Sequence, residues 1–461
     1  MKTYQDLQKA IEKGKGLAGF IRTCIEEYKS SDMYQTAVIA DEYDRHLNRT
    51  ILQYQKLLYT LSGSTVPDNF SANFKVPSNH FGRFVSHQTQ YLLGNGITWK
   101  NGDTVKNKLG KDFDYQVQKA ARTALVTAVG YGFFNLDHVE VFSALDFVPF
   151  FDETNGALMA GIRFWQIDDT KPLRAVLYEL DGYTDYMYRA GKATEVNPKR
   201  TYKQIAVTTP KDGTEIFDGD NYPSFPIVPC YANPHKQSEF IGMREQIDAY
   251  DLIKSGFCND LDDASQIYWT IQNGGGMDDV DLATFVQRMK TVKAAILEDD
   301  GATAEAHTLE VPFNAREAIL TRLENDMYKD FMIINPYDIA NGAVTATQIK
   351  AAYEPMNVKT DSFEYCVTEF ITGILEIAGI TDEEPTFDRS MIINQTEMIQ
   401  NVAMSALYLP RDYVTSKIMT ILGDGDMVES ALEQIDEEDY TRMASGTAQE
   451  GAQEPESGEK S

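Results

Sequence analysis

One long amphipathic segment constrains the fold of this chain more than any other feature of the sequence. Residues 233–265 read NPHKQSEFIGMREQIDAYDLIKSGFCNDLDDAS. Extended to Tyr268 and folded as a helix, the segment spans about 30 residues, which at ~1.5 Å per residue makes a rod of roughly 45 Å. A rod of this length calls for another element packed along it, although periodicity alone is equally consistent with an ordinary core helix.

The two faces of this predicted helix differ in chemistry. Its apolar stripe recurs every three or four residues and consists of Phe240, Met243, Ile247, Tyr250, Phe257, Leu261 and Ala264. Its opposite face carries the acidic residues Glu245, Asp248, Asp251, Asp262 and Asp263. One face is therefore suited to packing, and the other to solvent, a neighbouring chain or a ligand.

Length and composition describe a globular chain. With 461 residues, of which 43% are hydrophobic, it has room for two or three domains with sizeable cores. Because it has no run of 18 apolar residues and begins with a polar segment, we expect neither membrane insertion nor secretion. The scattered cysteines, Cys24, Cys230, Cys258 and Cys366, indicate buried thiols in a reducing cytoplasm rather than a zinc site.

The formal net charge is −28. Proteins that grip nucleic acid carry basic surfaces, because neutralised phosphates supply most of the binding energy. This chain repels DNA on average. The charge indicates either solubility or a surface past which DNA moves without adhering, and composition does not separate the two.

The part before the long segment divides into helices and then strands. Residues up to Asn79 are predicted to be helical, with a loop at Ser62–Asn73. Two further helices are predicted at His80–Leu93 and from Asp112 to about Val129. Beyond Phe133, short aromatic and β-branched runs separated by Asn-Gly and Asp-Gly pairs predict strands and hairpins.

The part after the long segment predicts a small insert and a second rod. The insert has a helix from Val280 to about Thr291 and strands at Lys293–Glu298 and His307–Val311. The second rod has an apolar stripe of Leu320, Leu323, Met327, Phe331 and Ile334. Asn314 and Glu317 match a capping box at its start, and it stops before Pro336.

The remaining C-terminal sequence predicts more helices. One starts at Thr345, with Gln348 in capping-box spacing, is kinked at Pro355 and ends at Gly379. A strand at Pro385–Ile393 and two or three helices to about Met443 follow. The last residues are small, polar and acidic, which is typical of disorder.

No candidate active site, metal site or cofactor site emerges. An acidic group at Asp260, Asp262, Asp263, Asp278, Asp279 and Asp281 invites comparison with two-metal nucleases, but a solvated acidic face is the simpler interpretation. The glycines of Asn273–Gly276 lack the Gly-Lys-Ser/Thr ending of a P-loop. The six histidines include no HExxH pair, and no serine lies in a Gly-x-Ser-x-Gly elbow.

The order of residues along the rod is more specific than its periodicity. It runs Asn233, Pro234, Ser238, Glu239, Gly242, Ile247, Asp248, Ala249, Tyr250, Asp251, Ser255, Asn259 and Asp260. This pattern resembles the long helix of portal proteins from tailed bacteriophages, in particular the head-to-tail connector rings of the long-tailed siphophage type. The segments YLLGNGITW and VPFFDET, which precede the rod, extend the resemblance toward the N-terminus.

The resemblance implies a predominantly helical α+β fold with wing, stem, clip and crown regions. On this chain it places the wing at 1–237, the first stem helix at 238–268, the clip at 269–312, the second stem helix at 313–335, the channel loop at 336–345, a kinked helix returning to the wing at 346–392, the crown at 393–443 and a disordered acidic tail at 444–461.

The resemblance also implies a structural, non-enzymatic function. The expected assembly is a cyclic homo-oligomer of twelve subunits at one capsid vertex of the virion, assembled in the host cytoplasm, with a channel through which double-stranded DNA is packaged and ejected. Its expected partners are the terminase, the head-tail adaptor, and the major capsid and scaffolding proteins. No cofactor and no membrane are expected.

Nine residues become candidates for the channel or the subunit interface: Glu245, Asp248, Asp251, Asp262, Arg322, Lys329, Asn341, Gly342 and Thr345. Arg322 and Lys329 lie seven residues apart on the polar face of the second rod. Three roles stay open for them: a solvated surface, a match to the acidic rod of a neighbouring subunit, or transient contacts with DNA phosphates.

Two rival functions remain. A metal-dependent phosphohydrolase or nuclease would use the aspartate clusters and would lose magnesium-dependent turnover in Asp262→Asn or Asp279→Asn. A capsid-associated scaffolding or interaction protein would share the acidity and the helices but would form no channel.

Overall fold

The computed structural model describes residues 2–435 except 15, 60–62, 70, 190–191, 209–215, 265–267, 273–277, 292–302, 308–311, 337–345, 391–394 and 429. The chain divides into two compact units. The first comprises Met1–Asn335 and Pro355–Ser390, and the second Pro336–Glu354 and Met391–Ser461. Helices and antiparallel sheets are both present, so the predicted α+β class is confirmed.

The first unit begins with helices and one hairpin. The helices are α1 (Tyr4–Glu12), α2 (Leu17–Lys29), α3 (Asp32–Asp44) and α4 (Arg49–Gln53). Strands β1 (Leu57–Tyr59) and β2 (Thr65–Pro67) follow and pair with each other. The hairpin is a correction, because β2 lies inside Ser62–Asn73, which was predicted to be a loop.

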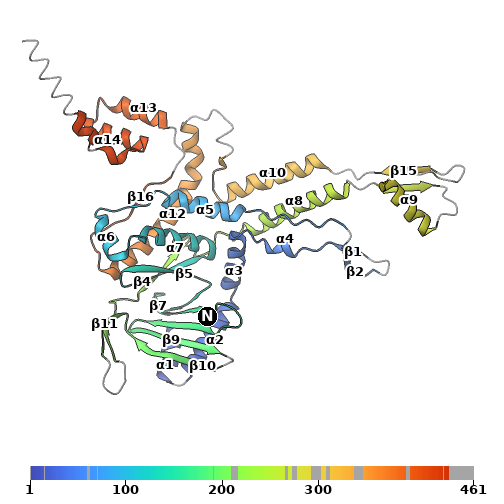
Figure 1. Ribbon diagram of the computed structural model, residues 1–461. Helices are drawn as coiled ribbons and strands as arrows, with labels where there is room; N and C mark the ends of the chain where they lie inside the picture. Colours follow the sequence, from blue (N-terminus) through green and yellow to red (C-terminus); the bar gives the residue numbers. More distant parts are fainter. Residues whose placement is uncertain are drawn as a thin grey trace, which may run out of the picture. The chain divides into compact units, whose positions relative to one another are not determined.

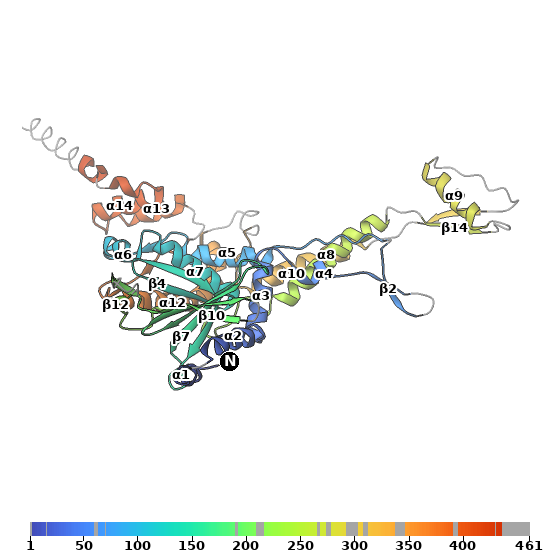
Figure 2. The same cartoon turned by 60° about the horizontal axis from the view of Figure 1, so that its bottom comes forward.

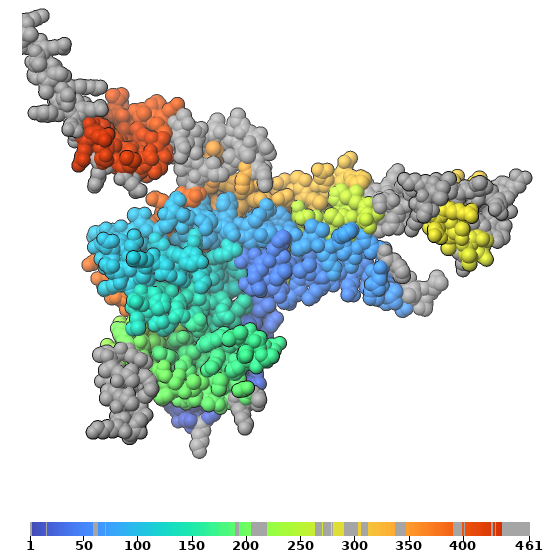
Figure 3. Space-filling model, viewed as in Figure 1, coloured from blue at the N-terminus to red at the C-terminus, as the bar shows by residue number. Residues whose placement is uncertain are grey.

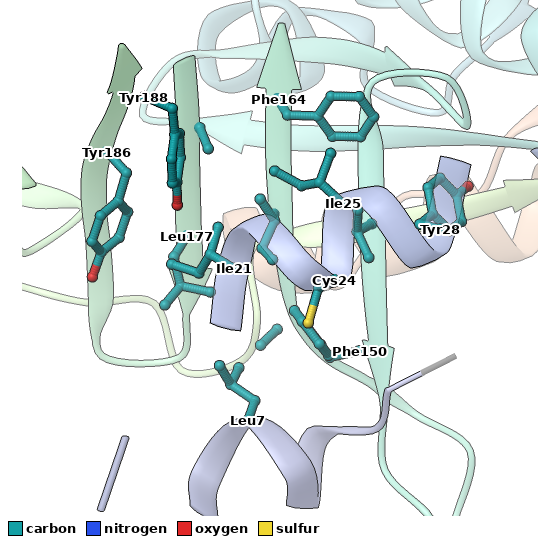
Figure 4. Close-up of a cluster of buried hydrophobic side chains, with 14 residues drawn as sticks. Leu7, Ile21, Cys24, Ile25, Tyr28, Phe150, Phe164, Leu177, Tyr186 and Tyr188 are labelled. Atoms are coloured by element: carbon teal, nitrogen blue, oxygen red, sulfur yellow. The ribbon is translucent and has the colours of Figure 1, made fainter. Parts of the chain in front are cut away.

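A five-stranded antiparallel meander forms the largest sheet, in the order β10-β9-β8-β7-β6. Its strands are β6 (Phe147–Phe151), β7 (Leu158–Trp165), β8 (Leu173–Glu179), β9 (Gly182–Arg189) and β10 (Lys192–Arg200). Helices α1 and α2 cover one face, where Leu7 and Ile21 are fully buried against Phe150, Ile162 and Leu177 (Figure 4). Burial of these alternating apolar side chains holds the layers together.

A three-stranded sheet, β13-β4-β5, joins the meander to a helical layer. It consists of β4 (Val129–Asn135), β5 (His138–Ser143) and β13 (Ile227–Tyr231) and lies beside α7 (Phe113–Thr127). Helices α5 (His80–Leu93) and α6 (Gly102–Leu109), strand β3 (Ile97–Thr98) and the hairpin of β11 (Lys203–Thr208) and β12 (Ile216–Asp220) complete this region (Figure 1). Helix α5 has the predicted bounds.

The two predicted rods are present as α8 (Arg244–Ala264) and α10 (Phe313–Asp330). Between them in sequence lie β14 (Tyr268–Gln272), α9 (Asp279–Thr291) and β15 (Thr303–His307), with β14 and β15 paired antiparallel. The views of Figures 1 and 2 agree that α8 and α10 lie side by side. The helix predicted at Val280–Thr291 is confirmed.

Helix α12 (Ala346–Ala378) contains Pro355 and spans both units, because their boundary falls at that residue. Strand β16 (Thr386–Phe387) then pairs with β3. The second unit also contains α13 (Gln395–Ser405), α14 (Arg411–Leu422) and the short helix η1 (Gly425–Met427). Helix α14 ends at Gly423, whose φ of 91° lies in the left-handed region.

Two predicted helix starts are wrong. The first rod begins at Arg244 rather than Ser238, because Gly242 has a φ of 86° and interrupts the helix. Its predicted end is also wrong, because Tyr268 lies in strand β14. The second begins at Phe313 with Pro312 in the cap position and no side-chain cap bond, so the capping box of Asn314 does not form. Of the strand predicted at His307–Val311, His307 lies in β15, and residues 308–311 lie outside the described residues, as do Lys293–Glu298 and the tail.

Candidate functional site: the paired rods and their attachment

The start of the distinctive sequence pattern anchors the first rod to the body of its unit. The Ser238 Oγ donates to the Val126 carbonyl at 2.6 Å, and the Glu239 amide donates to the Leu125 carbonyl at 3.0 Å. Both carbonyls belong to the last turn of α7, where a helix has no partners of its own for them. The Asn233 side chain closes the turn by donating to the Glu239 carboxylate at 3.0 Å.

A buried lysine joins the bases of both rods to α12. The Lys359 Nζ lies 2.7 Å from the Glu239 carboxylate and donates to the Phe331 carbonyl at 3.0 Å. It also lies 3.4 Å from the centre of the Phe331 ring. Because the Lys359 side chain is only 14% exposed, burial lowers its pKa, and Glu239 opposes that shift. Glu239 precedes α8 and Phe331 follows α10, so one cation fixes both ends.

Aromatic packing reinforces this base. Phe240 packs on Phe81 of α5, with ring centres 5.1 Å apart. Tyr328 and Phe331 of the second rod pack on Phe84 of α5 at 5.0 and 5.1 Å. Both rods therefore rest on the same helix, which contributes apolar burial as well as aromatic contacts.

The polar face of α8 binds a nearby segment of the same chain. Side-chain oxygens of Asp251, Ser255 and Asn259 accept hydrogen bonds from the amides of residues 78, 76 and 74, at 2.9, 3.0 and 2.6 Å. Four residues of a helix rise about 6 Å, close to the roughly 6.6 Å covered by two residues of an extended chain. Residues four apart on the helix can therefore meet alternate amides. We call this arrangement the ladder and residues 74–78 the strap.

Residues that precede the β1–β2 hairpin also bind the polar face of α8. The Asn48 Nδ2 donates to the second oxygen of Asp251 at 2.6 Å, and Thr50 donates to Asp248 at 2.9 Å. Tyr43 also donates to Asp248. Asp251 is fully buried, and burial raises its pKa although these donors favour the carboxylate.

The two rods run antiparallel and contact each other along their length. Phe257 packs edge-on against Phe313 with ring centres 5.6 Å apart, and Asp260 forms an ion pair with Arg316. Near the other end, Gln246 donates to Asp330. Figure 3 shows α4, α8 and α10 as one contiguous group. The described contacts therefore supply the element that the length of the first rod required.

The structure separates the candidate residues into three sets. Asp248 and Asp251 bind partners within the chain, so they are not part of a free acidic face. Glu245 and Asp262 are exposed on α8. Arg322 and Lys329 are 84% and 76% exposed on α10, and both form ion pairs with Asp326 of the same helix, at 3.6 and 3.9 Å.

The other three candidates, Asn341, Gly342 and Thr345, lie outside the described residues. Among the residues that are described, no group of three or more histidine, cysteine or carboxylate side chains is arranged to hold a metal ion. Asp260 is paired with Arg316, and Asp278 accepts the amides of Val280 and Asp281 at the start of α9. In the same described part, no helix has both the length and the apolarity to cross a membrane.

Sequence reasoning missed the ladder and the lysine at the base. The signal for the ladder was present, because Asp251, Ser255 and Asn259 recur every four residues with short hydrogen-bonding side chains. Lys359 carried no local signal, since its partners are more than 25 residues away in the sequence.

Comparison with known proteins accounts for the pattern. The family described as phage portal protein, SPP1 Gp6-like, matches residues 40–441. The chain is 30% identical over 185 residues to a portal protein of Clostridium phage phiCD119, covering 38% of this chain and 40% of that protein. It is 21% identical over 385 residues to the portal protein of Bacillus phage SPP1, covering 76% and 73%. The chain therefore belongs to the SPP1 Gp6-like family of phage portal proteins, which are structural proteins of the virion and not enzymes.

Proposed function

We propose that this chain is one subunit of a ring-shaped channel at one capsid vertex, through which double-stranded DNA is packaged and ejected. The ring would contain twelve copies, assembled in the host cytoplasm. The observation that carries the proposal is the antiparallel pair of α8 and α10, fixed at one end by Lys359 and the aromatic contacts with α5. Elongated elements held rigidly at their base are suited to standing side by side around an axis.

The proposed regions follow the element order. Residues 1–237 would form the wing, α8 and α10 the stem, and the β14–β15 pair with α9 the clip. Residues 336–345 would form the channel loop, residues 346–392 the helix returning to the wing, and residues 393–443 the crown. The clip would dock the terminase during packaging and the head-tail adaptor afterward, and the wing would contact the major capsid and scaffolding proteins.

The charge of the chain suits a channel through which DNA slides. A net charge of −28 disfavours tight binding of a polyanion, whereas a few exposed cations supply weak, salt-sensitive contacts. Arg322 and Lys329 are cations of this kind on α10. Each already lies near Asp326, so its interaction with a neighbour or with phosphate would be modest.

Negative-stain electron microscopy of the purified full-length chain tests the proposal. Closed rings with a central hole are expected. Monomers or compact dimers at high protein concentration would contradict a ring, and they are the result expected of a scaffolding or interaction protein that forms no channel.

A charge reversal tests the two exposed cations. If Arg322 and Lys329 contact a neighbour or DNA, Arg322→Glu with Lys329→Glu lowers ring yield or DNA packaging, and the defect deepens at low salt. Lys106→Glu with Lys111→Glu is a matched control, because both lysines are exposed and lie outside the rods. Normal assembly and packaging in both double variants would leave the solvated surface as the role of Arg322 and Lys329.

A further inference from the structure

Hydrogen bonds hold the base of the β1–β2 hairpin in place, whereas no other described strand pairs with its two strands. We call the described residues 54–59, 63–69 and 71–78 the arm; it includes strands β1 and β2 and the strap. Asn48 and Thr50 hold the chain entering the arm to α8, and the ladder holds the chain leaving it. The Lys75 Nζ donates to the Leu52 carbonyl at 2.6 Å and ties the two sides together.

The hairpin exposes apolar side chains on both of its faces. Leu57 is 55% exposed, and on the other face the cross-strand neighbours Leu58 and Val66 are each 40% exposed. Within the described residues, β1 and β2 pair only with each other. Isolated two-stranded hairpins are marginally stable in water, and uncovered strand edges recruit other chains. The arm is therefore built to be covered by another surface.

The same chain carries a complementary surface on α8. Glu245, Ala249, Leu252 and Gly256 form one stripe of this helix, between the strap and α10. Leu252 is 45% exposed, and a Cβ added at Gly256 would meet nothing within 4 Å, so the stripe is open. Helix α8 contains six acidic and two basic residues, whereas the arm contains two lysines and one aspartate.

We propose that the arm of one subunit docks on this α8 stripe of the next subunit, an inference that rests on the ring proposed above. A ring needs a heterologous contact, in which two different patches of one chain are complementary. The arm supplies apolar side chains with a positive charge, and the stripe supplies Leu252 with Glu245. Because the ladder fixes the base of the arm, little conformational entropy is lost when the arm docks.

Cross-linking of assembled rings tests this contact directly. Rings are made from equal amounts of ¹⁴N- and ¹⁵N-labelled chains and treated with a carbodiimide, which joins lysine amines to carboxylates at zero length. Mixed-isotope peptides joining Lys56 or Lys75 to Glu245 are expected. Rings that yield other intersubunit cross-links but none between the arm and α8 would overturn the proposed arm contact, while the proposal that the chain forms a ring would stand. Absence of rings in the unmodified chain would remove both proposals.

Matched substitutions give a second, independent measurement. Leu58→Ser with Val66→Ser removes one apolar face of the hairpin, and Leu252→Ser changes the facing stripe. Each is expected to raise the protein concentration at which rings dissociate by about tenfold. Ile167→Ser is the control, because Ile167 is 82% exposed and lies outside both patches. Equal dissociation of all three variants and wild type, with unchanged circular dichroism, would contradict the arm contact.

Discussion

From the hydrogen bonds of the ladder we predict that the strap binds α8 more weakly when Asp251 is changed to alanine. One oxygen of this carboxylate accepts the Ser78 amide at 2.9 Å, and the other accepts the Asn48 Nδ2 at 2.6 Å. Asn48 cannot turn its amide to compensate, because its own oxygen accepts the Ile51 amide at 3.2 Å. Both donors would therefore lose their partner.

The size of the stability loss expected for Asp251→Ala follows from the burial of the two side chains. Asp251 is fully buried and Asn48 is 1% exposed, so water does not replace the lost acceptor without rearrangement. Hydrogen bonds to a charged group are worth about 1.5–3 kcal/mol each, and part of that is offset by relief of the buried charge. We expect a net loss of about 3 kcal/mol for Asp251→Ala. Ser255→Ala and Asn259→Ala remove neutral acceptors and are expected to cost about 1 kcal/mol each.

Hydrogen exchange of the strap amides measures this locally. In Asp251→Ala, a loss of about 3 kcal/mol in the free energy of local opening should accelerate exchange of the Ser78 amide roughly 100-fold. In Ser255→Ala and Asn259→Ala, a loss of about 1 kcal/mol should accelerate exchange of the residue 76 and residue 74 amides, respectively, roughly fivefold. Glu245→Ala is the matched control, because Glu245 is an exposed acid on the same helix. Unchanged exchange at residues 74–78 in Asp251→Ala would refute the ladder as the element that holds the strap.

Three further perturbations test the body of the first unit. Lys359→Met is expected to lower the free energy of unfolding by about 3 kcal/mol in urea titrations, and adding Glu239→Gln should recover part of the loss by removing the stranded charge. Gly161→Ala should cost at least about 2 kcal/mol, because the new Cβ would lie 1.9 Å from the buried Phe147 ring. Burial lowers the pKa of His80 from 6.5 to about 4, so the unfolded chain binds the proton more readily. The contribution of His80 to the free energy of unfolding is therefore fully present above pH 6.5 and is lost as the pH falls toward 4. Unfolding titrations should show a loss of about 2 kcal/mol at pH 5, and this loss should be smaller in His80→Gln.

The sequence was most informative where a periodic pattern also sets the burial. Helix α5 and the strands from β5 to β9 appear where apolar spacing and turn residues predicted them, whereas β4 begins at Val129, ahead of the predicted strand region. Boundaries were less predictable, because they depend on contacts from elsewhere. Gly242 adopts a left-handed conformation that delays the first rod, and residues 238 and 239 instead bind the end of α7.

The arm shows why the hairpin was missed. Its strands have only three residues each, and Gly and Pro surround them, so local propensity favours a loop. What orders the base is a set of side-chain hydrogen bonds from α8, about 180 residues away in sequence. A pattern of acceptors every four residues signals this kind of binding, but it does not identify the segment that is bound.

The polar face of α8 consequently performs two tasks rather than one. Residues 251, 255 and 259 bind the strap, and Asp248 binds Thr50 and Tyr43, so the chemistry of these four residues is used within the chain. The exposed Glu245 lies on a neighbouring stripe and remains open to another molecule. A substitution in the first set should loosen the arm in an isolated subunit, whereas one in the second should alter only assembly. Subunit folding and ring formation can therefore be perturbed separately from two faces of a single helix.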